Sequence, residues 1–290
     1  MRPPPPTPSP RHSVVAFAPN SASRLPMACM FLRAAFSSSR FSHAGRAGAI
    51  LVMTTLFQPG CTAEHHARGQ TSSSRPTKLN ARPTQSTPVC APGQYELDVA
   101  PGRRALMRVT RPRPTRTRAL LLALHGAGSG GAPGGLWAFH GAWDLPGLVI
   151  VAPAAAGNSW SLEPRDIRFV DRALAMAFAR CRIDRRRVAV GGFSAGAGLA
   201  LWLGLTNGNL FRAIVVLSGG GSLPTERVGK PHVLVAHGAA DTIIPIAYGG
   251  DAIVRQLRSE GYRVTYRRFA GGHRPVPAIA RAFTASGLYG

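Results

Sequence analysis

The chain has 290 residues, of which 45% are hydrophobic, and 35 Lys and Arg stand against 12 Asp and Glu for a net charge of +23. This length and apolar content suffice for one sizeable core, which excludes a disordered chain. Four Cys are too few for a fold built from disulfides, and no apolar stretch approaches the roughly 20 residues of a spanning helix. A multi-pass membrane protein is therefore excluded as well.

The positive charge is a weak signal for any particular partner. Lys78 and Lys230 are the only Lys, so the basic residues are nearly all Arg, and they are scattered through Ala- and Gly-rich sequence. The densest group, Arg182 with Arg185–Arg187, lacks the interleaved aromatic residues of a single-strand binder. We expect a solvated basic surface and no nucleic-acid partner, with attraction to phospholipid or lipopolysaccharide as the alternative.

Residues 1–61 are interpreted as an N-terminal extension followed by an export signal. After Met30, three Arg precede an apolar run at Ala47–Phe57, and the run is closed by a Gln-Pro-Gly-Cys sequence that ends at Cys61. This is the order of a secretory signal, so we expect the mature chain to be exported. Cys61 is also a candidate lipidation site that would tether the protein to a membrane of the bacterial cell envelope. Secreted protein and lipoprotein remain equal alternatives.

Residues 62–89 contain Ser, Thr, Pro, Arg and Gln with almost no aliphatic residues, which predicts an extended, solvated tether. The globular part begins at Cys90, and because residues 90–290 show no internal repeat we predict one domain there. Cys90 and Cys181 are the candidate disulfide in an oxidising compartment, and two free thiols are the alternative.

From residue 95 onward the sequence alternates between strand and helix patterns. Strands at 95–99 and 104–109 flank a Pro-Gly turn and predict an antiparallel hairpin. Continuous apolar runs predict strands buried on both faces of a sheet, and helical periods predict the helices between them. These strands are expected at 119–124, 148–152, 188–190, 213–217 and 232–236, and the helices at 166–180, 195–205, 249–260 and 278–285. A last strand is expected at 263–269. The order predicts an α/β fold with a mostly parallel sheet and helices on both faces.

A Gly-x-Ser-x-Gly motif, Gly192–Gly196, stands between a predicted strand and a predicted helix with Ser194 at its centre. In so Gly-rich a chain this motif can occur by chance, so its position between a strand and a helix is the stronger evidence. A Ser at a sharp strand-to-helix turn keeps its hydroxyl exposed, and the helix start offers the N–H of Ala195 to an oxyanion. The motif predicts a nucleophile at Ser194, against the alternative of an ordinary Gly-rich turn.

Two further residues complete a catalytic constellation. Asp241 and His273 each follow a predicted strand, as Ser194 does, so nucleophile, acid and base occur in that order along the chain. The carboxyl ends of parallel strands gather at one edge of an open sheet. We therefore predict that the three side chains meet there as a Ser–His–Asp triad.

Four motifs in this order carry a resemblance to a known family. They are Leu124–Gly128, Gly192–Gly196, His237–Asp241 and Gly271–His273. Residues 119–290 resemble an α/β-hydrolase of the small phospholipase/carboxylesterase type, close also to extracellular poly(3-hydroxybutyrate) depolymerases and feruloyl esterases. The resemblance implies an α/β-hydrolase fold and a serine hydrolase that cleaves carboxylic esters through an acyl-enzyme.

The resemblance also assigns the oxyanion hole and bears on the substrate. It implies that the N–H of Ala127 joins that of Ala195 as the second oxyanion donor. Arg274-Pro275 stands where depolymerases often have Thr-Trp-Pro, which weakens the polymer-specific interpretation, and a poly(3-hydroxybutyrate) depolymerase or a feruloyl esterase is the alternative function. A function of another class also stays open, a surface-anchored binding protein that keeps an idle triad on a hydrolase scaffold.

The substrate is expected to reach an open site. The stretch Gly219–Pro231 is too short for a helical cap, so we predict no large cap domain and access for bulky or polymeric esters as well as small ones. The Gly-rich stretch 126–141 is expected to form a loop that flexes near the pocket. Candidate apolar walls of the pocket, each also explained by core packing, are Trp137, Phe139, Trp143, Trp160 and Phe193.

A dinucleotide fingerprint at Gly126–Gly131 needs to be weighed against this interpretation. Such a site requires a helix directly after the glycines and an acid at the end of the next strand. Here Ala132–Gly135 is expected to prolong the loop, and the strand 148–152 ends in Pro153 without an acid. No Cys and His spacing suits zinc. We therefore expect neither a metal nor a cofactor.

Overall fold

The computed structural model describes residues 77–84, 90–115 and 117–290. The chain divides into Met1–Ala67 and Arg68–Gly290, and the second unit holds all the described residues. The predicted extension and export signal, with the candidate lipidation site Cys61, therefore lie outside the described residues, as do parts of the predicted tether.

The domain consists of eight strands and the helices between them. The strands are β1 (Gly93–Ala100), β2 (Arg103–Val109), β3 (Arg118–Leu124), β4 (Leu148–Pro153), β5 (Ile183–Phe193), β6 (Ala213–Leu217), β7 (His232–Gly238) and β8 (Val264–Phe269). The helices are α1 (Ala132–Ala138), the short 3-10 helix η1 (His140–Ala142), α2 (Pro164–Arg180), α3 (Ala195–Thr206), α4 (Gly250–Ser259) and α5 (Pro277–Tyr289).

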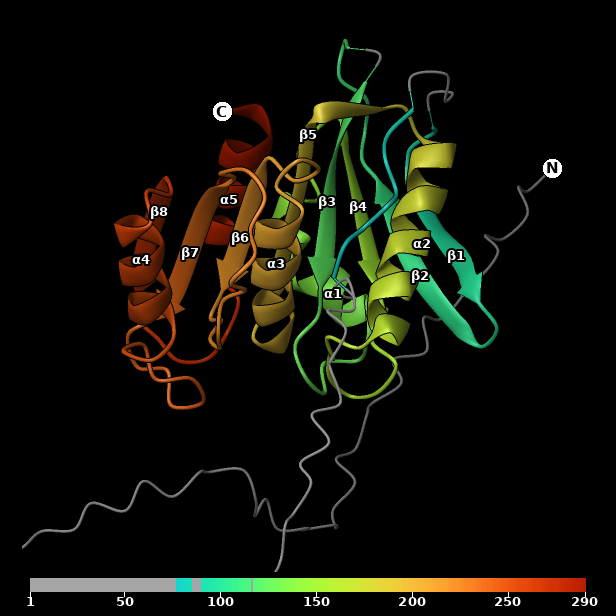
Figure 1. Ribbon diagram of the computed structural model, residues 1–290. Coiled ribbons are helices and arrows are strands. Elements are labelled where there is room, and N and C mark those ends of the chain that lie inside the picture. Colours follow the sequence, from blue (N-terminus) through green and yellow to red (C-terminus); the bar gives the residue numbers. More distant parts are fainter. Residues whose placement is uncertain (1–76, 85–89, 116) are drawn as a thin grey trace, which may run out of the picture. The chain divides into compact units, whose positions relative to one another are not determined.

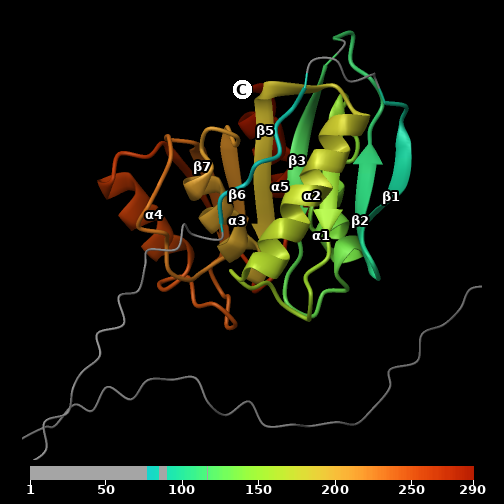
Figure 2. The ribbon, with the colours of Figure 1, turned by 45° about the vertical axis from the view of Figure 1, so that its right-hand side comes forward.

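One sheet in the order β1-β2-β4-β3-β5-β6-β7-β8 forms the middle layer. β2 pairs antiparallel with β1 and with β4, and the remaining neighbours are parallel. Figures 1 and 2 show α2, α3 and α4 on one face and α1 and α5 on the other. The predicted mostly parallel sheet with helices on both faces is confirmed.

The central strands are buried on both faces, which explains their continuous apolar sequence. In β3, Leu120, Leu122 and Leu124 belong to the core beneath α2, α3 and α4, whereas Leu121 and Ala123 belong to the core beneath α1 and α5. The edge hairpin β1–β2 instead alternates exposed and buried residues, as a strand pair with one solvated face does. The central strands are thus covered by helices on both faces, whereas this edge of the sheet has one solvated face.

Helix α1 was not predicted, because the sequence indicated a flexible Gly-rich loop there. Pro133 lies in the first turn, where its missing N–H costs no helical hydrogen bond, and Leu136 is buried against the sheet. A Cβ on Gly135 would lie 2.6 Å from the carbonyl oxygen of Ala123, so this Gly lets the helix approach β3 closely. The expectation that no helix follows Gly126–Gly131 directly is therefore wrong. The second argument against a dinucleotide site holds, because β4 ends in Pro153 and not in an acidic residue.

The segment Thr77–Thr84 has neither helix nor strand, yet it lies against the domain. Leu79 is fully buried and its N–H donates to Asn207 Oδ1 at 2.8 Å. The next two backbone N–H groups, of Asn80 and Ala81, both donate to Asp171 Oδ1 at 2.8 Å. Because its backbone donors find side-chain acceptors on α2 and after α3, this stretch differs from the solvated tether that was predicted.

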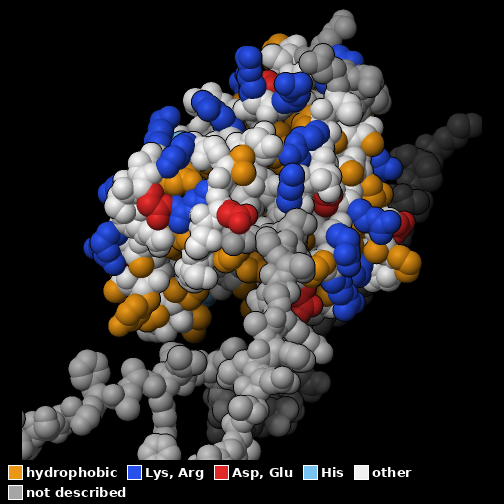
Figure 3. All heavy atoms as spheres, in the orientation of Figure 1, with side chains coloured by type: hydrophobic (Ala, Val, Ile, Leu, Met, Phe, Trp, Pro, Cys, Tyr) orange, Lys and Arg blue, Asp and Glu red, His pale blue; other side chains and the backbone are white. Residues whose placement is uncertain are grey.

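The surface features agree with an open, uncapped domain. Residues 218–231, between β6 and β7, form no helix or strand, which confirms the predicted lack of a cap at this position. Basic side chains are spread over the face that carries α2, α3 and α4 rather than gathered in one patch (Figure 3). Within the described ranges, no helix is long and apolar enough to cross a membrane, and no group of three or more His, Cys, Asp and Glu could hold a metal ion.

A disulfide joins Cys90 to Cys181, as predicted. It ties the residues ahead of β1 to the end of α2, where Cys181 is fully buried. Arg118 reinforces the same corner, since its Nη2 donates to the carbonyl of Cys90 at 3.0 Å and its Nη1 to that of Thr110 at 2.9 Å. The hairpin β1–β2 is thereby fastened to the main body of the sheet.

Reduction of this disulfide is expected to lower the free energy of unfolding by about 3 kcal/mol, because the bond closes a long loop in the unfolded chain. The two cysteines are 91 residues apart in sequence. Urea denaturation with and without a thiol reductant measures the change, and the Cys90→Ser/Cys181→Ser double variant, which should not respond to reductant, is the control. A change below about 1 kcal/mol would contradict the expectation.

Candidate active site

Ser194 stands in a sharp turn between β5 and α3. Its φ of 55° and ψ of −120° form a backbone conformation that L side chains rarely adopt. Gly flanks it for a steric reason: a Cβ on Gly192 would lie 2.1 Å from the carbonyl oxygen of Gly196, and one on Gly196 would lie 2.4 Å from that of His125. The turn is thus the strained strand-to-helix elbow that the motif predicts.

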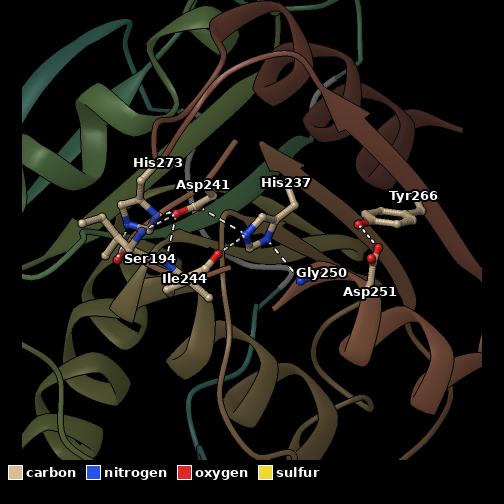
Figure 4. A network of polar contacts seen from close by, with 9 residues as sticks. Ser194, His237, Asp241, Ile244, Gly250, Asp251, Tyr266 and His273 are labelled. Carbon is tan, nitrogen blue, oxygen red and sulfur yellow. Dashed lines mark hydrogen bonds and ion pairs between the residues drawn. The ribbon is translucent and has the colours of Figure 1, made fainter. Parts of the chain in front are cut away.

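Three side chains meet at the carboxyl edge of the sheet (Figure 4). His273, beyond β8, places Nε2 2.8 Å from Ser194 Oγ and Nδ1 2.8 Å from Asp241 Oδ2. Asp241 comes from the turn after β7. With Nδ1–H donating to the carboxylate, Nε2 is left with a lone pair toward the hydroxyl. The structure therefore brings together all three residues of the predicted triad.

The Asp241 side chain is fully buried and surrounded by donors. Its Oδ1 accepts from the N–H of Ile243 at 3.0 Å and of Ile244 at 2.9 Å, while its Oδ2 accepts from His273. Burial alone would raise the pKa of this carboxyl, but the Ile244 and His273 hydrogen bonds, the His273 charge and the Ile243 hydrogen bond more than offset it. The pKa of Asp241 is lowered, so the carboxylate is ionised at neutral pH.

A second histidine lies behind that carboxylate. His237, fully buried at the end of β7, has its Nε2 2.8 Å from the carbonyl oxygen of Ile244 and 3.2 Å from Asp241 Oδ2. Its Nδ1 accepts the N–H of Gly250 at 3.2 Å, which places the ring proton on Nε2. Figure 4 shows this ring between the triad and the start of α4. His237 thus holds the turn that carries the acid.

Sequence reasoning included His237 in a motif but gave it no role. The available signal was its position at the end of a buried strand, four residues before the predicted acid. A buried imidazole needs partners for both nitrogens, and the following turn is where such partners are nearest.

The loop after β3 passes beside the serine. A Cβ on Gly126 would lie 3.4 Å from Ser194 Cβ and 2.9 Å from the Phe193 ring. Ala127 follows Gly126 and is exposed, while Ala195 is the first residue of α3, where backbone N–H groups lack an intrahelical acceptor. Both predicted oxyanion residues therefore border the serine, one through Gly126 and the other as its neighbour in sequence.

This loop is anchored by His125, the last residue before Gly126. The buried ring accepts the N–H of Ala155 at Nε2, at 3.0 Å, and donates from Nδ1 to the carbonyl of Gly126 at 2.8 Å. Burial lowers the pKa of His125 despite the opposing effects of the Gly126 carbonyl and Asp166. A neutral imidazole therefore pins the loop without adding charge near the reacting atoms.

The segment after β4 supports the same loop from behind. Trp160 Nε1 donates to the carbonyl of His125 at 2.8 Å, and the N–H of Gly128 donates to the carbonyl of Asn158 at 2.8 Å. The segment is itself held by Asp166 at the start of α2, which accepts from the N–H groups of Ala156 and Ser161. Trp160, a candidate pocket residue, thus contacts the loop after β3, which carries the predicted oxyanion donor Ala127, through its indole N–H.

The remaining candidate walls separate into two groups. Trp137, Trp143 and Phe193 line one hollow beside the site. Phe139 is fully buried in the core, where its ring would lie 2.7 Å from a Cβ on Gly191. Phe139 is thus a core residue and not a wall, whereas Trp160 is not among the residues that line this hollow.

Comparison with known proteins agrees with this fold. The sheet, the elbow and the order of the three residues define the class as an α/β-hydrolase. Residues 166–280, which include the whole triad, match the family model described as Phospholipase/Carboxylesterase. Over that range, about 40% of its length, the chain is similar to this family.

Individual relatives are distant. "Probable feruloyl esterase C" from Aspergillus oryzae is 26% identical over 147 residues, which are 46% of this chain and 54% of that protein, so the chain spans about half the length of this curated relative. The esterase PE8 structure superposes with a TM-score of 0.51 at 23% identity over 62% of this chain and 95% of that one. A ferulic acid esterase gives 0.53 at 17% identity over 67% and 97%. Both structural likenesses show the fold.

Replacing His237 with Phe is expected to lower kcat about tenfold with little change in KM, because the turn that carries Asp241 loses its anchor at the Ile244 carbonyl. His237→Gln, which retains an N–H near the Nε2 position, should recover part of the rate. The readout is kcat per serine labelled by an active-site probe, so that unfolded protein does not count. Unchanged kcat per labelled site in His237→Phe would contradict a positioning role.

Stability should depend on pH through Asp241. Because its pKa is lower in the folded chain, the stabilisation by the carboxylate is complete above the unfolded-state value of about 3.9 and is lost as pH falls through the folded-state value. The difference in free energy of unfolding between wild type and Asp241→Asn should be constant from about pH 5 to 7 and should shrink below about pH 4. Urea denaturation across this range measures it, with Asp98→Asn, 84% exposed, as the control. A difference that widens in acid would contradict the lowered pKa.

Proposed function

We propose that this domain is a serine hydrolase that cleaves carboxylic esters through an acyl-enzyme. Ser194 Oγ attacks the carbonyl carbon while His273 Nε2 takes its proton, and Asp241 holds the imidazole tautomer and stabilises the imidazolium. His273 then returns the proton to the alcohol oxygen as the carbon–oxygen bond breaks. Water attacks the acyl-enzyme by the same route and releases the acid.

The observation that carries the proposal is the chain of two hydrogen bonds from Ser194 to Asp241. Both are 2.8 Å long, and they use different nitrogens of one imidazole, so a base and its orienting acid are already aligned on the hydroxyl. An idle triad on a binding protein would have no reason to keep the strained backbone at Ser194.

The N–H groups of Ala127 and Ala195 are assigned to the oxyanion hole. The start of α3 adds the positive end of a helix dipole where negative charge would develop. Loss of one such donor typically costs about 10²- to 10³-fold in rate. Because both donors are backbone groups, side-chain substitutions at these two positions do not remove them.

Ester hydrolysis as the reaction class is supported by the family match and by the name of the feruloyl esterase relative. Hydroxycinnamate esters are the second candidate within the class, since that relative aligns over 147 residues. Polyhydroxybutyrate remains the less supported alternative because of Arg274 after the catalytic His273. The lack of a cap between β6 and β7 favours substrates larger than the site itself.

We also propose that the protein is exported and works in an oxidising compartment. The support in the folded part is the Cys90–Cys181 disulfide, since such bonds persist mainly outside the reducing cytosol. Cleavage after the predicted signal, with or without lipidation of Cys61, stays a prediction that mass spectrometry of the mature protein tests.

Ser194→Ala is expected to abolish labelling by a fluorophosphonate probe and to reduce hydrolysis of a short p-nitrophenyl ester by at least about 10³-fold. Only an activated serine reacts with the probe, so the same measurement separates an enzyme from an idle scaffold. Ser286→Ala, an exposed serine on α5, is the matched control and should label and turn over like wild type. Retained activity in Ser194→Ala, or a wild-type protein that does not label, would overturn the proposed function.

A further inference from the structure

A hollow of about 480 Å³ lies beside the catalytic serine, between α1 and the β1–β2 edge. Its lining includes Leu106 from β2, Leu136 and Trp137 from α1, Trp143 after η1, and Phe193 at the end of β5. None of its lining residues is ionisable, although the chain as a whole carries a net charge of +23. The hollow therefore suits an uncharged, apolar group of a ligand.

Phe193 connects this hollow to the reacting atoms. It directly precedes Ser194, and its ring centroid lies 4.9 Å from that of His273. The same residue lines the hollow, and so does Ser129, whose Oγ donates to the carbonyl of Gly126 in the oxyanion loop at 2.7 Å. Phe193 therefore contacts both the triad histidine and the hollow, and it is the direct chain neighbour of Ser194.

The aromatic walls are fixed before any ligand arrives. Trp137 is 57% exposed, yet its ring stacks on His140 with centroids 5.4 Å apart and planes at 29°. His140 also meets the ring of Trp143 edge-on at 6.2 Å, and the guanidinium of Arg108 lies 4.3 Å from the Trp143 centroid. Because these rings lose little freedom on binding, a flat partner gains most of the stacking energy.

We propose that this hollow is the specificity pocket of the enzyme and that it takes a planar aromatic group of the ester, so that aromatic esters are its preferred substrates. The inference deepens the proposed function and rests on it. Its physical basis is a hollow with three aromatic walls and no ionisable lining residue, to which the neighbour of the nucleophile, Phe193, contributes one wall. Linear aliphatic chains would fill the hollow with a greater loss of rotamer freedom.

Two pairs of esters test the preference and show which side of the ester enters the pocket. Methyl cinnamate against methyl butyrate places the ring in the acid, and benzyl acetate against ethyl acetate places it in the alcohol. Wild type should show a kcat/KM at least about tenfold higher for the aromatic member of one pair. Equal kcat/KM within both pairs would overturn the proposal.

Variants then tie the preference to the hollow. Trp137→Ala removes a wall and Leu106→Trp fills the space, and each should lower kcat/KM for the preferred aromatic ester about tenfold while changing that for its aliphatic partner less than about twofold. Tyr248→Ala is the matched control, because this aromatic residue is 79% exposed and does not line the hollow. It should leave both values unchanged.

Labelling by the fluorophosphonate probe is measured on every variant, which keeps the two proposals distinguishable. If all proteins label but Trp137→Ala and Leu106→Trp lower both members of a pair equally, the pocket assignment is wrong and the esterase assignment stands. If wild type neither labels nor hydrolyses any of the four esters, the esterase proposal and the pocket proposal are both wrong. Loss confined to the aromatic ester in labelled Trp137→Ala and Leu106→Trp supports the pocket.

Discussion

The site depends on a backbone contact that is too close for any side chain. Where β5 turns into α3, Gly192 and Gly196 approach each other, and Gly196 also meets the carbonyls at the end of β3. This contact forces Ser194 into a positive φ and aims the start of α3 at the same point as its hydroxyl. Nucleophile and one oxyanion donor are thus set by one geometric constraint, which the two buried faces of the central strands keep rigid.

The mechanism needs an ionised Asp241 and a loop after β3 that adds no competing charge, and buried side chains hold both. On one side, Asp241 receives hydrogen bonds from its own turn and from His273, with His237 behind it tying the turn to α4. A buried carboxylate with fewer donors would be driven toward its neutral form, and the imidazolium that forms during catalysis would lose its partner. On the other side, neutral His125 and the Trp160 indole hold the oxyanion loop without adding a competing charge.

Much of this followed from the sequence, for physical reasons that differ between elements. Strands buried on both faces must be continuously apolar, so their positions could be predicted, and parallel pairing then brings Ser194, Asp241 and His273 to one edge. Helix α1 escaped prediction because its two Gly serve close approaches, Gly135 to β3 and Gly134 to Ser129, which are visible only in three dimensions. Leu79 escaped because the other two buried residues of its stretch, Thr77 and Ala81, are polar or small, so the sequence shows no apolar alternation there. The roles of His237 and His125 depend on carbonyls that no pattern reveals.

The parts of the site differ in how far substitutions there would disturb the reaction. The elbow, the acid turn and the oxyanion loop each act through backbone atoms or buried partners, so most substitutions there disturb the reacting geometry itself. The hollow beside Phe193 is built differently, mainly from side chains of the short helix α1, the hairpin β1–β2 and Trp143, and Ser129 is its one lining residue from the loop after β3. Substrate preference can therefore change through α1 and β2 while the triad stays fixed, because the two sets of contacts share little more than one phenylalanine ring.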